Sequence, residues 1–213
     1  MPAVYIVADN IYSPIGATTA DNFERVKKGI SGIQLHNDKA LWDEPVYVSL
    51  FDHLANDLKY SRFEQLLIAS VKDALRDSGV VVADEKTVLI ISSTKGNISL
   101  LETEPNNPEL NSRIAIHTSA KLVAEYFGFV NTPVVVSNAC ISGIMAILTG
   151  MRLIQSGQYE NAVITGADVI TKFVLSGFQS FQAISPEPCK PFDINRAGIT
   201  FIPDKETTLM IRP

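Results

Sequence analysis

Short runs of β-branched and aliphatic residues, separated by polar segments, dominate the hydrophobic pattern of the chain. The strongest run is TVLIISS at residues 87–93, which contains no charged residue. A continuous run of this kind, rather than an alternation of apolar and polar positions, is typical of a strand covered on both faces. Further strands are expected at residues 4–7, 132–137 and 161–168.

Between these runs, apolar residues recur with the period of a helix. Residues 61–79 are the clearest example, because Ser61 and Glu64 have the spacing of a capping box and a glycine closes the pattern. Shorter helical patterns occupy residues 18–29 and 119–128, and each also ends near a glycine. The chain is therefore predicted to alternate strands and helices.

This alternation predicts a layered α/β fold with a mixed, mainly parallel sheet flanked by helices. The chain has 213 residues, and we find no linker, repeat or low-complexity tract in it. We therefore expect a single domain over residues 1–213.

Composition and charge exclude several classes of function. Hydrophobic residues make up 46% of the chain and charged residues 19%, which argues against disorder. The formal net charge is −5 and no cluster of Lys and Arg occurs, so nonspecific binding to nucleic acid is not expected. The longest uncharged apolar run, residues 139–151, is shorter than the roughly twenty residues that span a bilayer. Two cysteines, Cys140 and Cys189, without a signal-peptide pattern indicate a cytoplasmic protein with free thiols.

Cys140 stands where the apolar run 133–136 gives way to a new helical pattern. A free cysteine beside a core helix is usually a packing residue. At a helix start, however, a thiol lies near unpaired amides and the positive end of the helix dipole, which favour a thiolate and can hold an oxyanion. The position therefore favours a nucleophile. Small residues in the helix that follows predict the close approach of another helix. They are Ala139, Gly143, Ala146 and Gly150.

The segment around Cys140, SNACISGIMAI, resembles the β-ketoacyl-acyl-carrier-protein synthases, and so do the downstream segments AVITGAD and CKPFDINRAG. The opening VYIVADNIYSPIG, the GISGI segment and the helix SRFEQLLIASVKDALRDSGV resemble the same family in the same order. The resemblance extends from near Met1 to about Gly198. It implies the thiolase-like fold, of which this chain would form the N-terminal half.

The resemblance implies that Cys140 accepts an acyl group from a thioester of acyl carrier protein or coenzyme A. A malonyl thioester would then lose CO₂ and condense with the acyl-enzyme in a Claisen reaction. Neither a cofactor nor a metal is implied. Phe178 is expected in the acyl pocket, and Lys59 and Arg62 are expected to attract the acidic carrier protein. The ordinary alternatives are a core aromatic residue and two exposed cations at a helix start.

The chain also departs from the family. The two catalytic histidines of these synthases lie in the C-terminal half, and His36, His53 and His117 do not fall in their motifs. After Gly198 the family continues with a Gly-Glu-Gly segment that is absent here. We therefore expect a truncated synthase, from an interrupted gene or as a genuine short relative. Such a chain would acylate itself without completing the condensation.

A lone half of this fold would expose the apolar helix after Cys140, and apolar surfaces of that size usually have a partner. We expect a homo-oligomer, formed by the strand at residues 133–136 or by a second copy in place of the other half, or a pairing with a full-length synthase. The alternative function is that of a non-catalytic half-synthase, a structural subunit that acts by association. A cysteine hydrolase has less support, because no histidine is placed to serve as its base.

Overall fold

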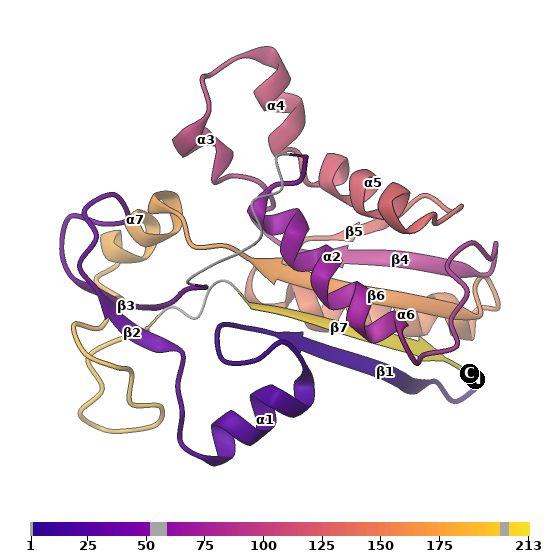
Figure 1. The fold of residues 1–213 in the computed structure, drawn as a ribbon, viewed down its shortest axis with the longest axis horizontal. Helices are drawn as coiled ribbons and strands as arrows, with labels where there is room; N and C mark the ends of the chain where they lie inside the picture. The colour runs from indigo at the N-terminus through magenta and orange to yellow at the C-terminus, as the bar shows by residue number, and fades with distance from the viewer. Residues whose placement is uncertain (1, 52–58, 201–204) are drawn as a thin grey trace.

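The computed structural model describes residues 2–51, 59–200 and 205–213. Its centre is a five-stranded sheet in the order β1-β7-β6-β4-β5 (Figure 1). The strands are β1 (Tyr5–Tyr12), β4 (Thr87–Ser92), β5 (Val134–Val136), β6 (Asn161–Asp168) and β7 (Lys205–Arg212). β4 runs parallel to β5 and β6, whereas β7 runs antiparallel to β1 and β6. The sheet is mixed, as predicted, but only half of its pairings are parallel because β1 and β7 add the antiparallel ones.

Helices cover both faces of this sheet (Figure 1). The helices of the described residues are α1 (Thr19–Lys27), α2 (Arg62–Leu75), α3 (Leu100–Thr103), α4 (Pro108–Ile114), α5 (Ile116–Phe127), α6 (Ser142–Gln155) and α7 (Lys172–Ser180). α2 and α5 pack against one face and α6 against the other. The predicted layered α/β architecture is confirmed. No helix in the described part of the chain is both long enough and apolar enough to cross a membrane.

β4 lies between two hydrophobic clusters, one on each face of the sheet. Its Leu89 and Ile91 face the α2 side, where they pack with Phe63, and its Val88 and Ile90 face the α6 side. These four side chains of β4 are fully buried. The continuous apolar run at residues 87–93 thus forms the two-sided buried strand that its pattern predicts.

The predicted helix ends are also present. The Ser61 hydroxyl accepts a hydrogen bond from Glu64 N at 3.2 Å, and Ser61 N donates to Glu64 Oε2 at 2.9 Å, which completes the capping box of α2. Thr18 Oγ1 accepts from Asp21 N at 3.1 Å at the start of α1. α5 ends at Gly128, whose φ of 79° places it in the left-handed region that favours glycine.

The second half of the predicted stripe of small residues packs against the sheet rather than against another helix, and for the exposed first half the approach of a helix stays a prediction. A Cβ atom at Gly150 would lie only 2.9 Å from Ile164 Cδ1 on β6. Ala146, one turn earlier, is fully buried in the same cluster. Ala139 and Gly143 are exposed. Small residues here let the helix approach the strands below it.

β7 is an internal strand of the sheet although the residues after Gly198 depart from the family pattern. Buried hydroxyl groups fix it to its neighbours: Thr208 Oγ1 lies 3.0 Å from Thr165 Oγ1 on β6 and 2.9 Å from Ser70 Oγ on α2. Ile211 packs on the other face in the α6 cluster. The terminal segment is therefore an integral part of the fold.

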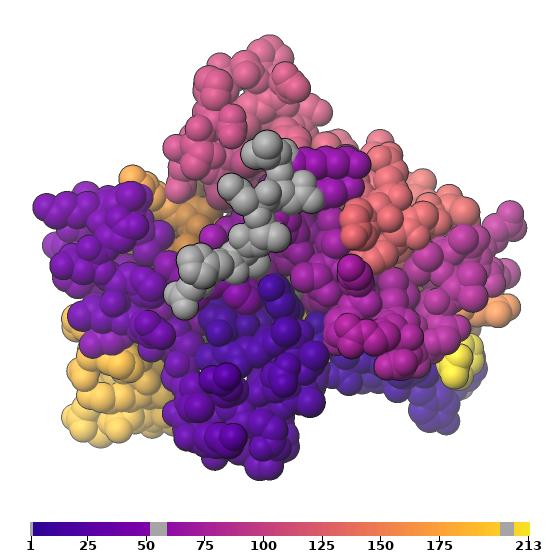
Figure 2. All heavy atoms as spheres, viewed as in Figure 1, coloured from indigo at the N-terminus to yellow at the C-terminus, as the bar shows by residue number. Residues whose placement is uncertain are grey.

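Two further units flank the layers. A second, two-stranded sheet consists of β2 (Ile33–His36) and β3 (Val46–Ser49), and its Val46 and Val48 pack against Leu175 of α7. α3 and α4 project away from the main sheet, at the top of Figures 1 and 2. These units extend the molecule beyond the carboxyl ends of β4 and β6.

Candidate active site

Cys140 lies at the predicted junction of strand and helix. It is the middle residue of a short 3₁₀ turn, η1 (Ala139–Ile141), between β5 and α6. Ser142 holds the turn closed, because its Oγ accepts from Asn138 N and donates to Ala139 O, both at 2.8 Å. Ala139 has a φ of 42°, in the left-handed region that non-glycine residues seldom occupy. The turn leaves Cys140 exposed with a free thiol.

The thiol borders a cavity of about 680 Å³ at the carboxyl ends of β4 and β6. In open α/β sheets this is the edge at which ligands bind. The apolar wall of the cavity consists of Ile147, Ile164, Val169, Val174, Phe178 and Leu209. Its size and its largely apolar wall suit a small organic substituent such as an acyl chain.

Gly166 on β6 is part of the cavity wall and needs to be glycine. It pairs with Ser92 of β4, and a Cβ atom at position 166 would lie 2.1 Å from Ser92 Oγ and 2.9 Å from Ser92 O. Such contacts are impossible without movement of the two central strands. The close approach of β4 thus explains why the segment AVITGAD has a glycine at position 166, which the sequence pattern alone did not reveal.

Two charged side chains, Lys95 and Asp168, also line the cavity. Lys95 lies on the loop after β4 and Asp168 at the end of β6, and Lys95 Nζ is 3.0 Å from Asp168 Oδ1. Sequence reasoning missed this ion pair, because its members are far apart in the chain and each looks like an ordinary loop charge.

Phe178 lines the same cavity as Cys140, and its role in an acyl pocket stays a prediction. It is on α7, which starts at Thr171, whose Oγ1 accepts from Val174 N at 3.1 Å. Phe178 is 37% exposed, whereas Phe173 and Phe181 are 63% and 83% exposed and do not line the cavity. The structure therefore brings together Cys140 and Phe178 and leaves the neighbouring phenylalanines apart.

Lys59 and Arg62 lie elsewhere. Lys59 is exposed and borders a second cavity of about 520 Å³ between the start of α2 and the α3–α4 projection. Arg62 is half-buried, and its Nη2 donates to Phe51 O at 3.3 Å. Neither residue lines the Cys140 cavity. Their expected role in carrier-protein docking stays a prediction.

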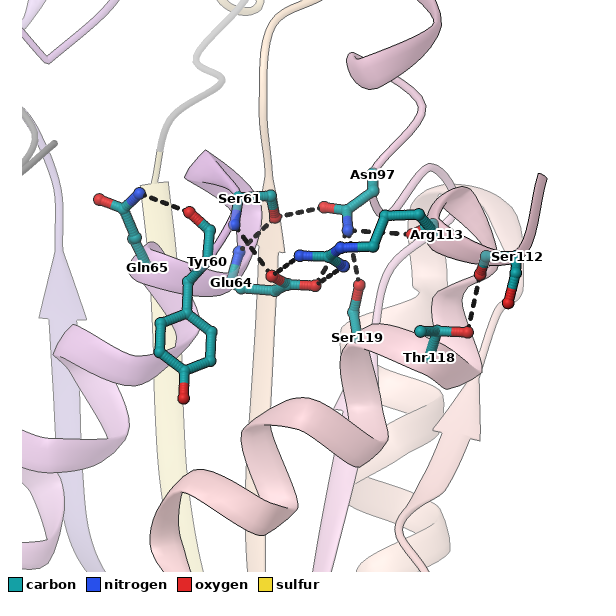
Figure 3. A network of polar contacts seen from close by, with 9 residues as sticks. All are labelled: Tyr60, Ser61, Glu64, Gln65, Asn97, Ser112, Arg113, Thr118 and Ser119. Carbon is teal, nitrogen blue, oxygen red and sulfur yellow. Dashed lines mark hydrogen bonds and ion pairs between the residues drawn. The ribbon is translucent and has the colours of Figure 1, made fainter. Parts of the chain in front are cut away.

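Glu64 has a second role that the capping-box pattern did not reveal. Its side chain is fully buried and forms a two-pronged ion pair with the Arg113 guanidinium of α4 (Figure 3). Asn97 Nδ2 also donates to Glu64 Oε1, to Ser119 Oγ at 2.9 Å each, and to Arg113 O at 3.2 Å. This network fastens the α3–α4 projection to the start of α2.

The charges in this network stabilise each other. Burial by itself would raise the pKa of Glu64, but hydrogen bonds from Arg113, Ser61 N and neighbouring side chains outweigh it and lower that pKa. The hydrogen bond to Glu64 raises the pKa of Arg113 against the effect of burial. Both groups are therefore held in their charged forms.

No histidine of the described residues lines the Cys140 cavity. His36 is on β2 and His117 is exposed on α5. His53 lies outside the described residues. A histidine base for the thiol is therefore not visible in the described part of the chain.

Comparison with known proteins places this arrangement in a family. Residues 1–201 match the family described as "Beta-ketoacyl synthase, N-terminal domain". The chain is 25% identical over 199 residues to "Putative polyketide beta-ketoacyl synthase 1" of Streptomyces cyaneus, an alignment that covers 78% of this chain and 47% of that protein. It is 23% identical over 199 residues to "Putative 3-oxoacyl-[acyl-carrier-protein] synthase, mitochondrial" of Schizosaccharomyces pombe, covering 83% and 46%. The chain thus spans about half the length of the curated relatives it matches.

Solved structures share the fold. A ketosynthase from Xenorhabdus doucetiae, solved in complex with its chain length factor, superposes with a TM-score of 0.82 at 21% identity, over 98% of this chain and 57% of that chain. A β-ketoacyl synthase from Burkholderia phymatum superposes with a TM-score of 0.82 at 18% identity, over 100% and 59%. The predicted thiolase-like fold is confirmed. With its family match over residues 1–201 and its thiol at the strand-to-helix junction, the chain belongs to the β-ketoacyl synthase family, of which it carries the N-terminal domain.

Proposed function

We propose that Cys140 is an acyl-accepting nucleophile and that the chain carries out the first half-reaction of a β-ketoacyl synthase. The observation that carries this proposal is the exposed thiol on the border of a largely apolar cavity, in a chain of this family. The acyl donor would be a thioester of acyl carrier protein or coenzyme A.

The chemistry follows from the position of the thiol. The Cys140 sulfur attacks the thioester carbonyl, a new C–S bond forms, and the C–S bond to the carrier breaks. The carrier leaves as a thiol with the proton that Cys140 gives up. The backbone N–H of Cys140, in the turn before α6, would be one donor to the transient oxyanion. The acyl chain then occupies the cavity beside Phe178.

The second half-reaction, Claisen condensation with a malonyl thioester, has no assigned acid or base among the described residues. We therefore expect this 213-residue chain to acylate itself without forming a β-ketoacyl product. Turnover of malonyl thioester by the isolated chain would contradict that expectation.

A second candidate function is association as a structural subunit. Ile144 on α6 is 62% exposed, and Tyr5 and Ile6 on the edge strand β1 are each 61% exposed. Large apolar side chains at an open helix face and an open sheet edge favour a protein partner. One structural neighbour is a ketosynthase in complex with its chain length factor. The partner of this chain would be a second copy or a full-length synthase, in the cytoplasm.

One experiment separates the two functions. The chain is incubated with hexanoyl-coenzyme A and its intact mass is measured, for the natural sequence, Cys140→Ala and the control Cys189→Ala. Acyl transfer predicts a mass increase of one hexanoyl group in the natural chain and in Cys189→Ala, and none in Cys140→Ala. If no form gains mass while sedimentation shows a stable oligomer or complex, association is the function.

A further inference from the structure

The Lys95–Asp168 ion pair lies in the same cavity as Cys140 and Phe178. We infer that this pair selects the acyl group: the cavity favours acyl chains that carry an oxygen substituent over plain saturated chains. The inference rests on the proposed acylation of Cys140, and it adds the substrate class. It derives from the contrast between two charges and the apolar remainder of the cavity wall.

The position of Lys95 is well defined by its loop. Ser93 Oγ is buried and accepts hydrogen bonds from Lys95 N at 3.2 Å and from Gly96 N at 3.0 Å. Gly96 has a φ of 52°, which allows the tight turn that follows the lysine. The ammonium group is therefore attached to a fixed backbone at the carboxyl end of β4.

The ammonium group retains capacity for a ligand. Lys95 Nζ contacts Asp168 Oδ1 and donates to Thr94 Oγ1, both at 3.0 Å. Within the described residues the hydrogen bond to Thr94 uses one of its three N–H donors, and Asp168 Oδ1, which is buried and forms no hydrogen bond, lies close to the ammonium group. The Lys95 side chain is only 21% exposed, whereas that of Asp168 is 48% exposed. The ammonium group is thus largely shielded from solvent and keeps a hydrogen-bond donor at the cavity wall.

An acyl chain on Cys140 would displace water from this wall. Saturated carbons that cover Lys95 and Asp168 remove hydration from two charges and return no hydrogen bond. A keto oxygen accepts the remaining N–H and avoids that cost. Sites that bind a substrate oxygen discriminate strongly against analogues that lack it. Because the pair is partly exposed, we expect about a tenfold preference, well below the discrimination that enclosed polar sites reach.

The test compares two donors of equal chain length. Hexanoyl and 5-oxohexanoyl thioesters of N-acetylcysteamine are offered separately to the natural chain, and the acylation rate of Cys140 is followed by mass spectrometry. We expect the 5-oxohexanoyl group to transfer about tenfold faster. Lys95→Met should reduce the ratio to about one, mainly by slowing the oxo donor. The matched control Lys121→Met, an exposed lysine on α5 outside the cavity, should keep the ratio of the natural chain.

A second measurement does not depend on reaction. In the Cys140→Ala chain, the dissociation constants of both thioesters are measured calorimetrically, with and without Lys95→Met. If the oxo thioester binds more tightly and Lys95→Met abolishes this preference, the result supports the inference even when no acyl group transfers to Cys140. In that case only the proposed acylation fails. Equal binding and equal acylation rates for both donors would overturn the inference. An equal loss of binding and rate for both donors in Lys95→Met would also overturn it, because the ion pair would then only maintain the shape of the cavity wall.

Discussion

Glu64 and Arg113, on different helices, form a two-pronged ion pair in which the carboxylate is fully buried and the guanidinium is 26% exposed. The pair connects the capped start of α2 to α4, and Asn97 and Ser119 complete its hydrogen bonds. The pair therefore attaches the α3–α4 projection to the sheet layers, together with the hydrogen bond from Asn97 Nδ2 to Arg113 O.

Removing the arginine should therefore destabilise the fold. Arg113→Met leaves a buried carboxylate without its partner, and breaking such pairs costs about 3–5 kcal/mol of unfolding free energy. Urea denaturation measures the loss. The control is Arg76→Met, which removes an exposed i,i+3 ion pair with Asp73 and should change stability by less than about 1 kcal/mol. Equal effects of the two substitutions would show that the buried pair does not anchor the fold.

The same pair makes stability depend on pH. The pKa of Glu64 in the folded chain is below its ordinary value of 4.5, so the unfolded chain binds its proton more readily. The contribution is complete above pH 4.5 and is lost as pH falls through the lower folded-state pKa. We expect the unfolding free energy of the natural chain to fall more steeply in this acidic range than that of Glu64→Gln. Parallel curves from urea titrations at several pH values would contradict the assignment.

Gly166→Ala should distort the sheet at the cavity. The added methyl group would collide with Ser92 Oγ and Ser92 O, and overpacking of this kind costs about 1–3 kcal/mol. Gly177→Ala on α7 is the control, because nothing lies within 4 Å of a Cβ atom there and alanine favours a helix. Thermal denaturation should show a lower melting temperature for Gly166→Ala and an unchanged or higher one for Gly177→Ala.

Phe178→Ala should slow acylation of Cys140 by hexanoyl thioesters about tenfold, because it removes the aromatic wall of the cavity. Phe181→Ala serves as the control, since that side chain is 83% exposed and outside the cavity. Rates from single-turnover mass spectrometry decide the outcome. If both variants keep the natural rate, Phe178 has no part in acyl binding.

Lys59→Glu should weaken the reaction with acyl carrier protein and spare the reaction with acyl-coenzyme A, because an exposed charge acts mainly on encounter with an acidic protein. We expect about a threefold to tenfold lower rate at low salt and a smaller difference at high salt. Lys28→Glu, an exposed lysine at the end of α1, is the matched control. An equal effect of both substitutions would assign the loss to net charge.

Local sequence signals predicted the parts of the fold that depend on neighbouring residues. Ser61 and Glu64 mark the start of α2 because a capping box needs only three-residue spacing, and residues 87–93 show their burial by composition. The change from an apolar run to a helical pattern placed Cys140 correctly between strand and helix. These signals are short-range, so they survive in the sequence alone.

Long-range relationships were out of reach for the same reason. Nothing near Lys95 in the sequence points to Asp168, and nothing near Glu64 points to Arg113. The stripe that includes Gly150 was assigned to a helix neighbour because spacing shows that something packs closely and does not show whether it is a helix or a sheet. The positions of Cys140 and Phe178 beside one cavity were therefore within reach of the sequence, whereas the ion pair between Lys95 and Asp168 was not.

The placement of β7 has a consequence for how the chain folds during synthesis. In the described sheet β1 is an edge strand whose hydrogen-bonded neighbour is β7, with Tyr5 opposite Arg212. β1 thus pairs with a strand that lies far along the chain, and pairings of such wide sequence separation form slowly. β1 cannot form this pairing in the nascent chain until residues 205–212 have been translated, so its apolar Tyr5 and Ile6 stay available to non-native contacts during that interval.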